Sequence, residues 1–378
     1  MRAMPPLPVR EHNRNAITGY LYGRRHATKQ EIERDLGLSQ PTITQNLRDL
    51  EQAGVVTRGG LMTSTGGRKA RAYAFNPRHR TAIGVSMRAT EVVMCAVDLY
   101  GATVAELRRT LPYRNVAAHY QRVGTLVNDF ATGVERTAGP VLGVAFSVRG
   151  IVSPDGRSIA FGAIMGNTGL TLDEISQSVR LPCTMVHDAD ASAMAELWDD
   201  PTLTDAVCLY LDRRPSGALI IDGALHPGPG RCNGAIEHMT LVPDGRPCYC
   251  GRRGCMDAYC SPETLPEDYE SIPGFFSVLE QGETHHRERM DAWLGHVAQA
   301  IANARCMVAG DVIIGGEAAQ YLDDHDIADL KARVEERCAF GGDFTLRTGR
   351  RHDDRDVTGA ALHLVDRHLG PIRGGTHA

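Results

Sequence analysis

Three cysteines and one histidine lie close together in this chain, at His238, Cys248, Cys250 and Cys255. Five prolines and glycines interrupt the same stretch, so the backbone is expected to loop there instead of forming a helix or a strand. A loop can bring four ligands to one point. Thiolate sulfurs and an imidazole nitrogen are donors that Zn²⁺ prefers, so the residue types and their spacing predict a zinc site.

The predicted zinc site is structural. One histidine and three thiolates complete a tetrahedron around Zn²⁺, whereas a catalytic zinc keeps one position open for water. The spacing differs from that of a zinc finger, in which two ligand pairs flank a helix. The alternative is a set of buried free thiols, because cysteine also serves as a small core residue.

The string G-x-x-x-H-x(9)-C-x-C-G-x-x-G-C, from Gly234 to Cys255, resembles the zinc loop of the ROK family, which is named for repressors, open reading frames and sugar kinases. The glycines match as well as the ligands. The resemblance implies an α/β protein with an actin-like ATPase (ribonuclease H-like), two-lobed sugar-kinase fold over residues 81–370 and a zinc loop at 234–260. Residues 371–378 are expected to form a C-terminal tail.

The same resemblance implies a sugar-binding cleft. Asp188 matches the carboxylate that takes the proton from the sugar hydroxyl in kinases of the family, although aspartate is also a favoured helix N-cap. Ala235 stands where the family has a sugar-binding glutamate. His238 would use one ring nitrogen for zinc and the other for a ligand hydroxyl. The residues expected to contact a sugar or sugar phosphate are Asn167, His187, Asp188, Glu237, His238 and Asp257.

Both phosphate-binding loops of the family's kinases are altered in this chain. The first reads D-x-G-G-T in the kinases, where the carboxylate holds Mg²⁺ through water and the glycines let N–H groups approach phosphate. Here Ser86 replaces the aspartate, and Arg88 and Ala89 replace the glycines. The second loop, G-T-G-x-G in the kinases, is replaced by the bulkier residues 212–217. We therefore expect no enzyme activity, with Asp188 as a vestigial base.

Charge is divided unevenly along the chain. Residues 1–80 contain 14 Lys and Arg against 6 Asp and Glu, a balance of +8. The whole chain contains 41 Lys and Arg and 46 Asp and Glu, so the residues after 80 contain 27 Lys and Arg against 40 Asp and Glu, a balance of −13. A basic segment attached to an acidic body is the electrostatic pattern expected when only that segment touches nucleic acid.

The basic segment has the pattern of a winged helix-turn-helix over residues 8–78. Helices are predicted at 13–24, 29–36 and 40–52, and strands at 55–58 and 71–75. Thr28 and Glu31 have the spacing of a capping box, and Ser39 is a favoured N-cap. The residues expected to contact DNA are Gln40, Thr42, Thr44, Gln45 and Arg48 on the third helix, with Arg68 and Lys69 in the wing. A protein-binding or dimerising module is the alternative.

Together these features predict a ROK-type transcriptional regulator, a repressor that binds double-stranded operator DNA and senses a sugar or sugar derivative. One recognition helix covers few base pairs, so a homodimer or tetramer is expected. The alternatives are a bifunctional sugar kinase with a DNA-binding head and an effector-independent DNA-binding protein. The first residues lack an apolar signal core and the longest apolar runs are short, so a cytoplasmic protein without membrane contact is expected.

Overall fold

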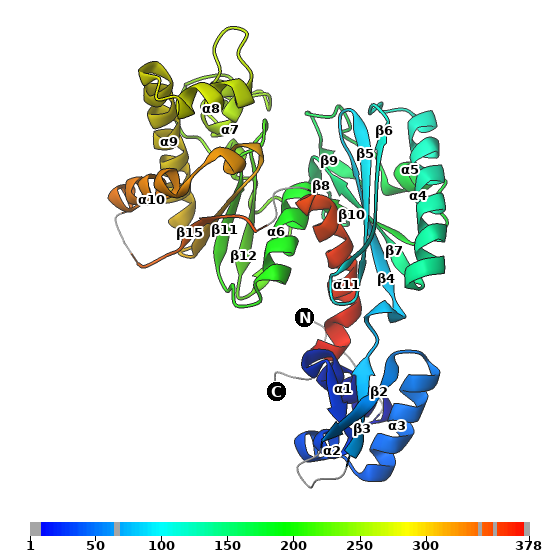
Figure 1. The fold of residues 1–378 in the computed structure, drawn as a ribbon. Helices are drawn as coiled ribbons and strands as arrows, with labels where there is room; N and C mark the ends of the chain where they lie inside the picture. The colour runs from blue at the N-terminus through cyan, green and yellow to red at the C-terminus, as the bar shows by residue number, and fades with distance from the viewer. Residues whose placement is uncertain (1–8, 64–68, 339–341, 351–353, 374–378) are drawn as a thin grey trace.

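The computed structural model describes residues 9–63, 69–338, 342–350 and 354–373. Figure 1 shows a small head, drawn in blue at one end, and two larger lobes side by side above it. No helix among the described residues is long and apolar enough to cross a membrane.

The head contains three helices and a three-stranded sheet in the order β1-β3-β2. Its elements are α1 (Val9–Arg24), β1 (His26–Thr28), α2 (Lys29–Leu36), α3 (Gln40–Gln52), β2 (Val56–Thr63), β3 (Lys69–Phe75) and the short 3₁₀ helix η1 (Pro77–His79). The predicted capping box is confirmed, because Thr28 and Glu31 exchange hydrogen bonds between side chain and backbone. Ser39 caps α3 as predicted. The first helix starts at Val9 instead of residue 13, and β1 was not predicted.

The first lobe is a five-stranded sheet in the order β10-β7-β4-β5-β6, covered on one face by α4. Its elements are β4 (Thr81–Met87), β5 (Glu91–Asp98), β6 (Thr103–Thr110), α4 (Ala117–Ala138), β7 (Val141–Val148), β8 (Ile151–Val152), β9 (Ile159–Phe161), α5 (Leu172–Ser176), β10 (Cys183–His187) and α6 (Asp188–Asp199). The hairpins β4–β5 and β5–β6 are antiparallel, whereas β7 and β10 run parallel to β4. The strands β4 and β5 are buried along almost their whole length.

The second lobe is also a five-stranded sheet, in the order β13-β12-β11-β14-β15. Its elements are β11 (Ala206–Tyr210), β12 (Ser216–Ile221), β13 (Ala224–Leu225), η2 (Ile236–His238), α7 (Asp257–Cys260), η3 (Pro262–Thr264), α8 (Ile272–Glu280), α9 (Thr284–Arg305), β14 (Asp311–Gly315), η4 (Glu317–Tyr321), α10 (Asp324–Arg337) and β15 (Leu346–Thr348). The helices α8, α9 and α10 bury most of their apolar side chains against this sheet and one another. Two such lobes on either side of a cleft agree with the expected fold.

The last helix, α11 (Arg355–Arg373), connects the cleft to the head. Its first turn lies between the lobes, and its last turn lies beside α1 (Figure 1). It crosses α6 so closely that a Cβ at Gly359 would overlap the carbonyl of Ala191. At the other end, Arg373 donates a hydrogen bond to the Tyr22 hydroxyl at 3.0 Å. The helix continues past residue 370, where the body was expected to end, and residues 374–378 lie outside the described part of the chain.

Candidate functional site

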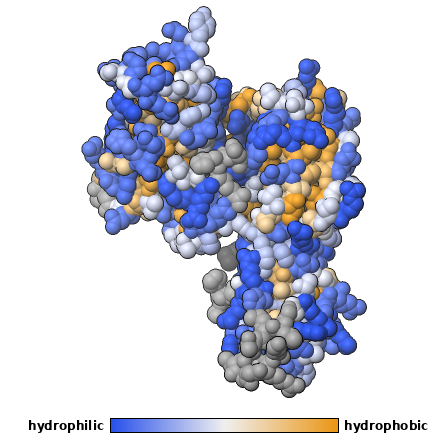
Figure 2. Space-filling model, in the orientation of Figure 1, coloured by the Kyte–Doolittle hydropathy of each residue, from blue (hydrophilic) through white to orange (hydrophobic). Residues whose placement is uncertain are grey.

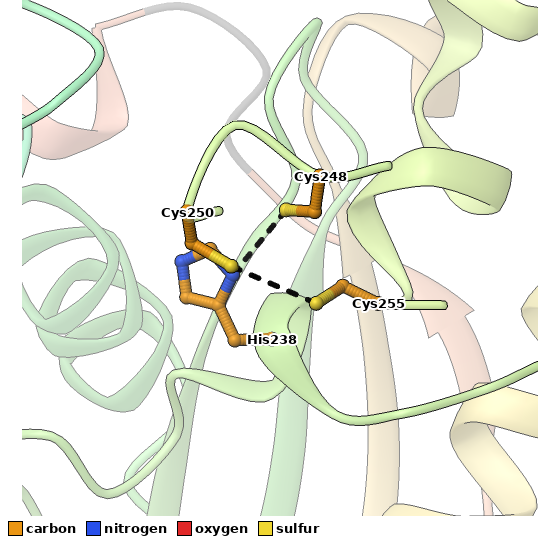
Figure 3. A group of neighbouring side chains, drawn as sticks. All are labelled: His238, Cys248, Cys250 and Cys255. Atoms are coloured by element: carbon orange, nitrogen blue, oxygen red, sulfur yellow. Dashed lines mark hydrogen bonds between the residues drawn. The ribbon is translucent and has the colours of Figure 1, made fainter. Parts of the chain in front are cut away.

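The structure brings the four predicted metal ligands together (Figure 3). One donor atom from each of His238, Cys248, Cys250 and Cys255 lies within 4.8 Å of the others. The Cys250 and Cys255 sulfurs are 3.7 Å apart, and the Cys248 sulfur is 3.7 Å from His238 Nδ1. An ion about 2.3 Å from each sulfur at tetrahedral angles would hold sulfurs about 3.8 Å apart. The donor set and its spacing therefore fit a tetrahedral zinc.

Backbone hydrogen bonds and glycines fix the shape of this loop. The Cys248 N–H donates to the Arg252 carbonyl at 2.8 Å, which closes the turn that presents two of the sulfurs. Gly254 has a φ of +77°, and a Cβ there would overlap the Val242 carbonyl. Only glycine tolerates both the conformation and the close approach. The hydrogen bond and the glycine thus fix the backbone from which the ligands project.

His238 turns its second ring nitrogen away from the cysteines. The Tyr249 hydroxyl lies 3.2 Å from His238 Nε2, and the Phe161 ring packs edge-on against the imidazole. A hydroxyl at this distance orients the imidazole, as partners of metal-bound histidines commonly do. In this structure Tyr249 therefore takes the position in which a ligand hydroxyl was expected. Sequence reasoning missed Tyr249, although it lies between two of the ligands.

A small cavity beside the metal loop contains three of the residues predicted to contact a ligand: His187, Asp188 and Glu237. Asp188 starts α6, directly after β10, so its carboxylate faces the space between the lobes. Its two oxygens lie 3.4 Å from Arg149 Nε and 3.2 Å from His187 Nε2. The aspartate does not cap the helix; the N-cap position is His187. A guanidinium and an imidazole therefore contact the Asp188 carboxylate, and its match to the kinase base stays a prediction.

Glu237 is the most deeply buried carboxylate of this cavity, with 5 % of its surface exposed. Burial raises its pKa to about 7, because the surroundings solvate the charged form poorly. The other two predicted contacts, Asn167 and Asp257, are also buried but do not line the cavity. Asp257 instead accepts a hydrogen bond from Arg214 at 3.2 Å. Ligand contact by any of these residues stays a prediction.

A larger cleft of about 440 Å³ adjoins the small cavity at the end of the altered phosphate loops. Arg88 contacts Asp354 at 2.8 Å and Asp356 at 3.1 Å, and Ser147 donates to Asp356 at 3.0 Å. Burial opposes ionisation of Asp356, but Arg88 and hydroxyl hydrogen bonds outweigh it and hold the pKa below its usual value. The Arg355 guanidinium bridges to Asp212 of the second lobe at 2.7 Å. Protein side chains thus form ion pairs beside the altered phosphate loops.

The third helix of the head exposes a polar face. Thr44, Gln45 and Arg48 are exposed, and Lys29 at the start of α2 donates to the Thr44 hydroxyl at 3.1 Å. Gln40 and Thr42 are half-buried, and the Gln40 amide is hydrogen-bonded to Glu33. Arg68 lies outside the described residues, and only the backbone of Lys69 is described. Contact of these residues with DNA stays a prediction.

Two family models match most of the chain. Residues 82–364 match the model of the ROK family. The chain belongs to the ROK family. Residues 13–58 match a second model, described as bacterial regulatory protein, arsR family, and this match covers the helix-turn-helix. The resemblance inferred from the zinc loop is therefore confirmed.

Relatives of this ROK protein include regulators and kinases. The DNA-binding transcriptional dual regulator NagC of Escherichia coli K12 is 23% identical over 287 residues, which are 75% of this chain and 69% of NagC. A crystal structure of a ROK family transcriptional regulator, described as a homolog of the E. coli MLC protein, covers 96% of this chain and 98% of its own at 17% identity, with a TM-score of 0.77. A Streptomyces griseus ROK glucokinase, solved with glucose and AMPPNP, covers 74% of this chain and 98% of its own at 19% identity, with a TM-score of 0.60. The predicted winged head and two-lobed body are confirmed as the fold.

Sequence reasoning missed several charged residues of the ROK body. Arg355 and Asp356 form ion pairs with Asp212 and Arg88, which join segments far apart in the chain. Arg149, which contacts Asp188, was missed as well. The sequence signal for Arg88 was that it stands where the family's kinases have glycine.

Proposed function

We propose that this ROK protein is a transcriptional regulator, acting as a repressor, which binds operator DNA through its head and senses a sugar or sugar derivative through its body. The observation that carries this proposal is the fusion of a helix-turn-helix with an exposed polar recognition helix to a ROK body whose phosphate loops are replaced by ion pairs. The naming of NagC as a DNA-binding transcriptional regulator supports it.

The proposed regulator acts as a homodimer or tetramer. Two heads on a two-fold axis would read half-sites about 34–36 Å apart, the length of one DNA turn. Figure 2 shows apolar side chains gathered on the lobe that contains β4 and β5, whereas the described part of the head is mostly hydrophilic. An apolar area on a body lobe is suited to contact between copies and leaves the heads free for DNA. Ligand control would follow from different affinities for two arrangements of the heads.

Replacing Arg48 with alanine is expected to weaken DNA binding by roughly 10- to 100-fold, because one base-contacting arginine contributes about 1–3 kcal/mol. Duplexes selected from a random library by the wild-type protein provide the target, and fluorescence anisotropy at fixed salt provides the affinity. Arg136→Ala is the matched control, since Arg136 is an exposed arginine on α4 of the body. Equal affinities for wild type and Arg48→Ala would place the recognition surface elsewhere.

The body is proposed to have lost phosphoryl transfer. A kinase needs positioned phosphates and Mg²⁺, and here Arg88 and Arg355 are paired with carboxylates in the space those groups require. The second candidate function, a bifunctional sugar kinase, is favoured by one observation: the base position, Asp188, is retained.

A coupled assay for ADP release across a panel of sugars distinguishes the two candidates. We expect release with sugar to equal the sugar-free background, while an added authentic sugar kinase gives full signal in the same mixture. Sugar-dependent turnover that disappears in Asp188→Asn would establish the kinase instead. Thermal-shift measurements with the same sugars separate a sensor from an effector-independent DNA-binding protein, because a ligand that binds the folded state raises Tm.

A further inference from the structure

The helix α6 packs into two different hydrophobic cores. Ala189, Ala193 and Leu197, spaced four residues apart, pack with strands β11 and β12 of the second lobe. Met194 and Trp198, also four residues apart, pack with side chains of the head and of the first lobe. Positions four apart lie on one face of a helix, so α6 has one face toward each core. The helix therefore connects the second lobe to the side of the body that carries the head.

The core that receives Trp198 continues into the head. Ile17 of α1 belongs to the same cluster of buried side chains as Leu99, which follows β5, and Leu369 of α11. The backbones of α1 and α11 also approach closely, because a Cβ at Gly19 would overlap the Ile372 carbonyl. The head is thus packed against the body instead of hanging on a free linker. A change in this packing would change the orientation of the head.

Trp198 lies where α6, the first lobe and the head meet. Its Nε1 donates a hydrogen bond to the Tyr100 carbonyl at 3.1 Å. A Cβ at Gly101 would overlap the indole nitrogen, so the ring fills space that only glycine leaves open. The Arg373 guanidinium carbon lies 4.6 Å from the centre of the indole, and Arg373 donates to the Tyr22 hydroxyl at 3.0 Å. One guanidinium therefore connects the end of α6 to α1.

The other end of α6 lies in the space between the lobes. Asp188, its first residue, lines both the small cavity and the larger cleft, and Ser192, one turn later, lines the larger cleft. The helix has twelve residues, which span about 18 Å at about 1.5 Å per residue. A helix packed on two sides moves as a unit over this distance. A displacement at Asp188 is therefore expected to reach Trp198.

We propose, on the basis of the regulatory function proposed above, that α6 couples the cleft to the head. Opening or closing of the cleft moves α6 together with the second lobe, and Trp198 then displaces Arg373 and Tyr22, which changes the orientation of α1 and of the head on DNA. The two states that an effector must distinguish are two positions of α6. Trp198 and Arg373 are positioning residues, because they act through the packing of α1.

A double-mutant cycle on DNA affinity tests this coupling without an effector. Arg149→Ala removes the guanidinium that faces Asp188 at the start of α6, and Trp198→Phe removes the hydrogen-bond donor at its end. With duplexes selected by the wild-type protein, Arg149→Ala should change Kd at least about 5-fold, the lower end of the usual range for coupled sites. In the Trp198→Phe background the same substitution should change Kd less than about 2-fold, because the contact between α6 and Arg373 is altered.

An Arg149→Ala effect of equal size in both backgrounds would overturn the coupling and leave DNA binding intact. So would an Arg149→Ala variant with wild-type Kd. Failure of the wild-type protein to select any duplex would instead overturn the regulatory function, and the coupling with it.

Two further variants control the cycle. Trp293→Phe replaces the only other tryptophan of the chain, which lies in the core of the second lobe, and should leave the Arg149→Ala effect at its full size. Arg373→Gln changes a partly exposed side chain and should remove the Arg149→Ala effect as Trp198→Phe does. If Trp198→Phe does not fold, the cycle with Arg373→Gln decides.

Trp198 fluorescence measures the coupling in the opposite direction. In Trp293→Phe, Trp198 is the single tryptophan, so its emission reports on the junction alone. Coupling between two sites is reciprocal, so binding of a selected duplex to the head should shift the wavelength of this emission. An emission maximum that stays the same at saturating duplex would contradict the proposed movement of Trp198.

Discussion

Cys250→Ser is expected to release the bound metal and to lower the Tm of the body by roughly 10 °C or more. Three thiolates and one imidazole hold the loop that connects the small cavity to the second lobe, and metal binding to such a site contributes directly to folding. Without Cys250, the remaining three donors leave an open position and a less constrained loop. The measurements are zinc content per chain, expected near one for wild type, and thermal unfolding.

Cys306→Ser is the matched control for this experiment. Cys306 is exposed at the end of α9, so its replacement should change neither the zinc content nor Tm. Extended dialysis of the wild type against a strong chelator should reproduce the Cys250→Ser result. A zinc-free Cys250→Ser protein with wild-type Tm would show that the four side chains are only a cluster of core thiols.

Gly359→Ala is expected to destabilise the body by about 3 kcal/mol and to abolish DNA binding, although the residue lies far from the head in the chain. The added Cβ would overlap the Ala191 carbonyl, so α11 and α6 would have to separate. The helix α6 begins at Asp188 in the cleft, and α11 ends against α1 of the head. A change in the packing of α6 against α11 is therefore expected to affect both the cleft and the contact between the body and the head. Chemical denaturation and anisotropy with selected duplexes measure the two effects.

Gly133→Ala provides the control for the glycine substitution. Gly133 lies inside α4 with open space around the position of a Cβ, so alanine should stabilise that helix by about 0.5–1 kcal/mol. A loss of stability in Gly359→Ala together with a gain in Gly133→Ala would support close packing where α11 crosses α6. If Gly359→Ala also stabilised the protein and kept DNA binding, the packing of α11 against α6 could not be what links the cleft to the head.

The sequence by itself determined the features that depend on neighbouring residues. The caps at Thr28 and Ser39 were predicted because a helix start requires a side-chain acceptor within three residues of unpaired N–H groups. The metal ligands were predicted because glycines and prolines force the intervening backbone into turns. The grouping of the four side chains is confirmed, whereas zinc as their metal stays a prediction. The changes in the phosphate loops could also be predicted from the sequence, because each loop is a short continuous stretch of residues.

Only the tertiary structure decided which distant charges meet. Arg88 and Asp356 are 268 residues apart, and their contact exists because α11 crosses the sheet that contains β4. From the sequence, Asp257 and Glu237 were both predicted to contact a ligand. In the fold, Asp257 is hydrogen-bonded to Arg214, whereas Glu237 lines a cavity. Electrostatic partners follow from proximity in space, and the packing of whole elements sets that proximity. A local pattern therefore specifies a capped helix or a metal loop, but it does not specify the partners of a buried charge.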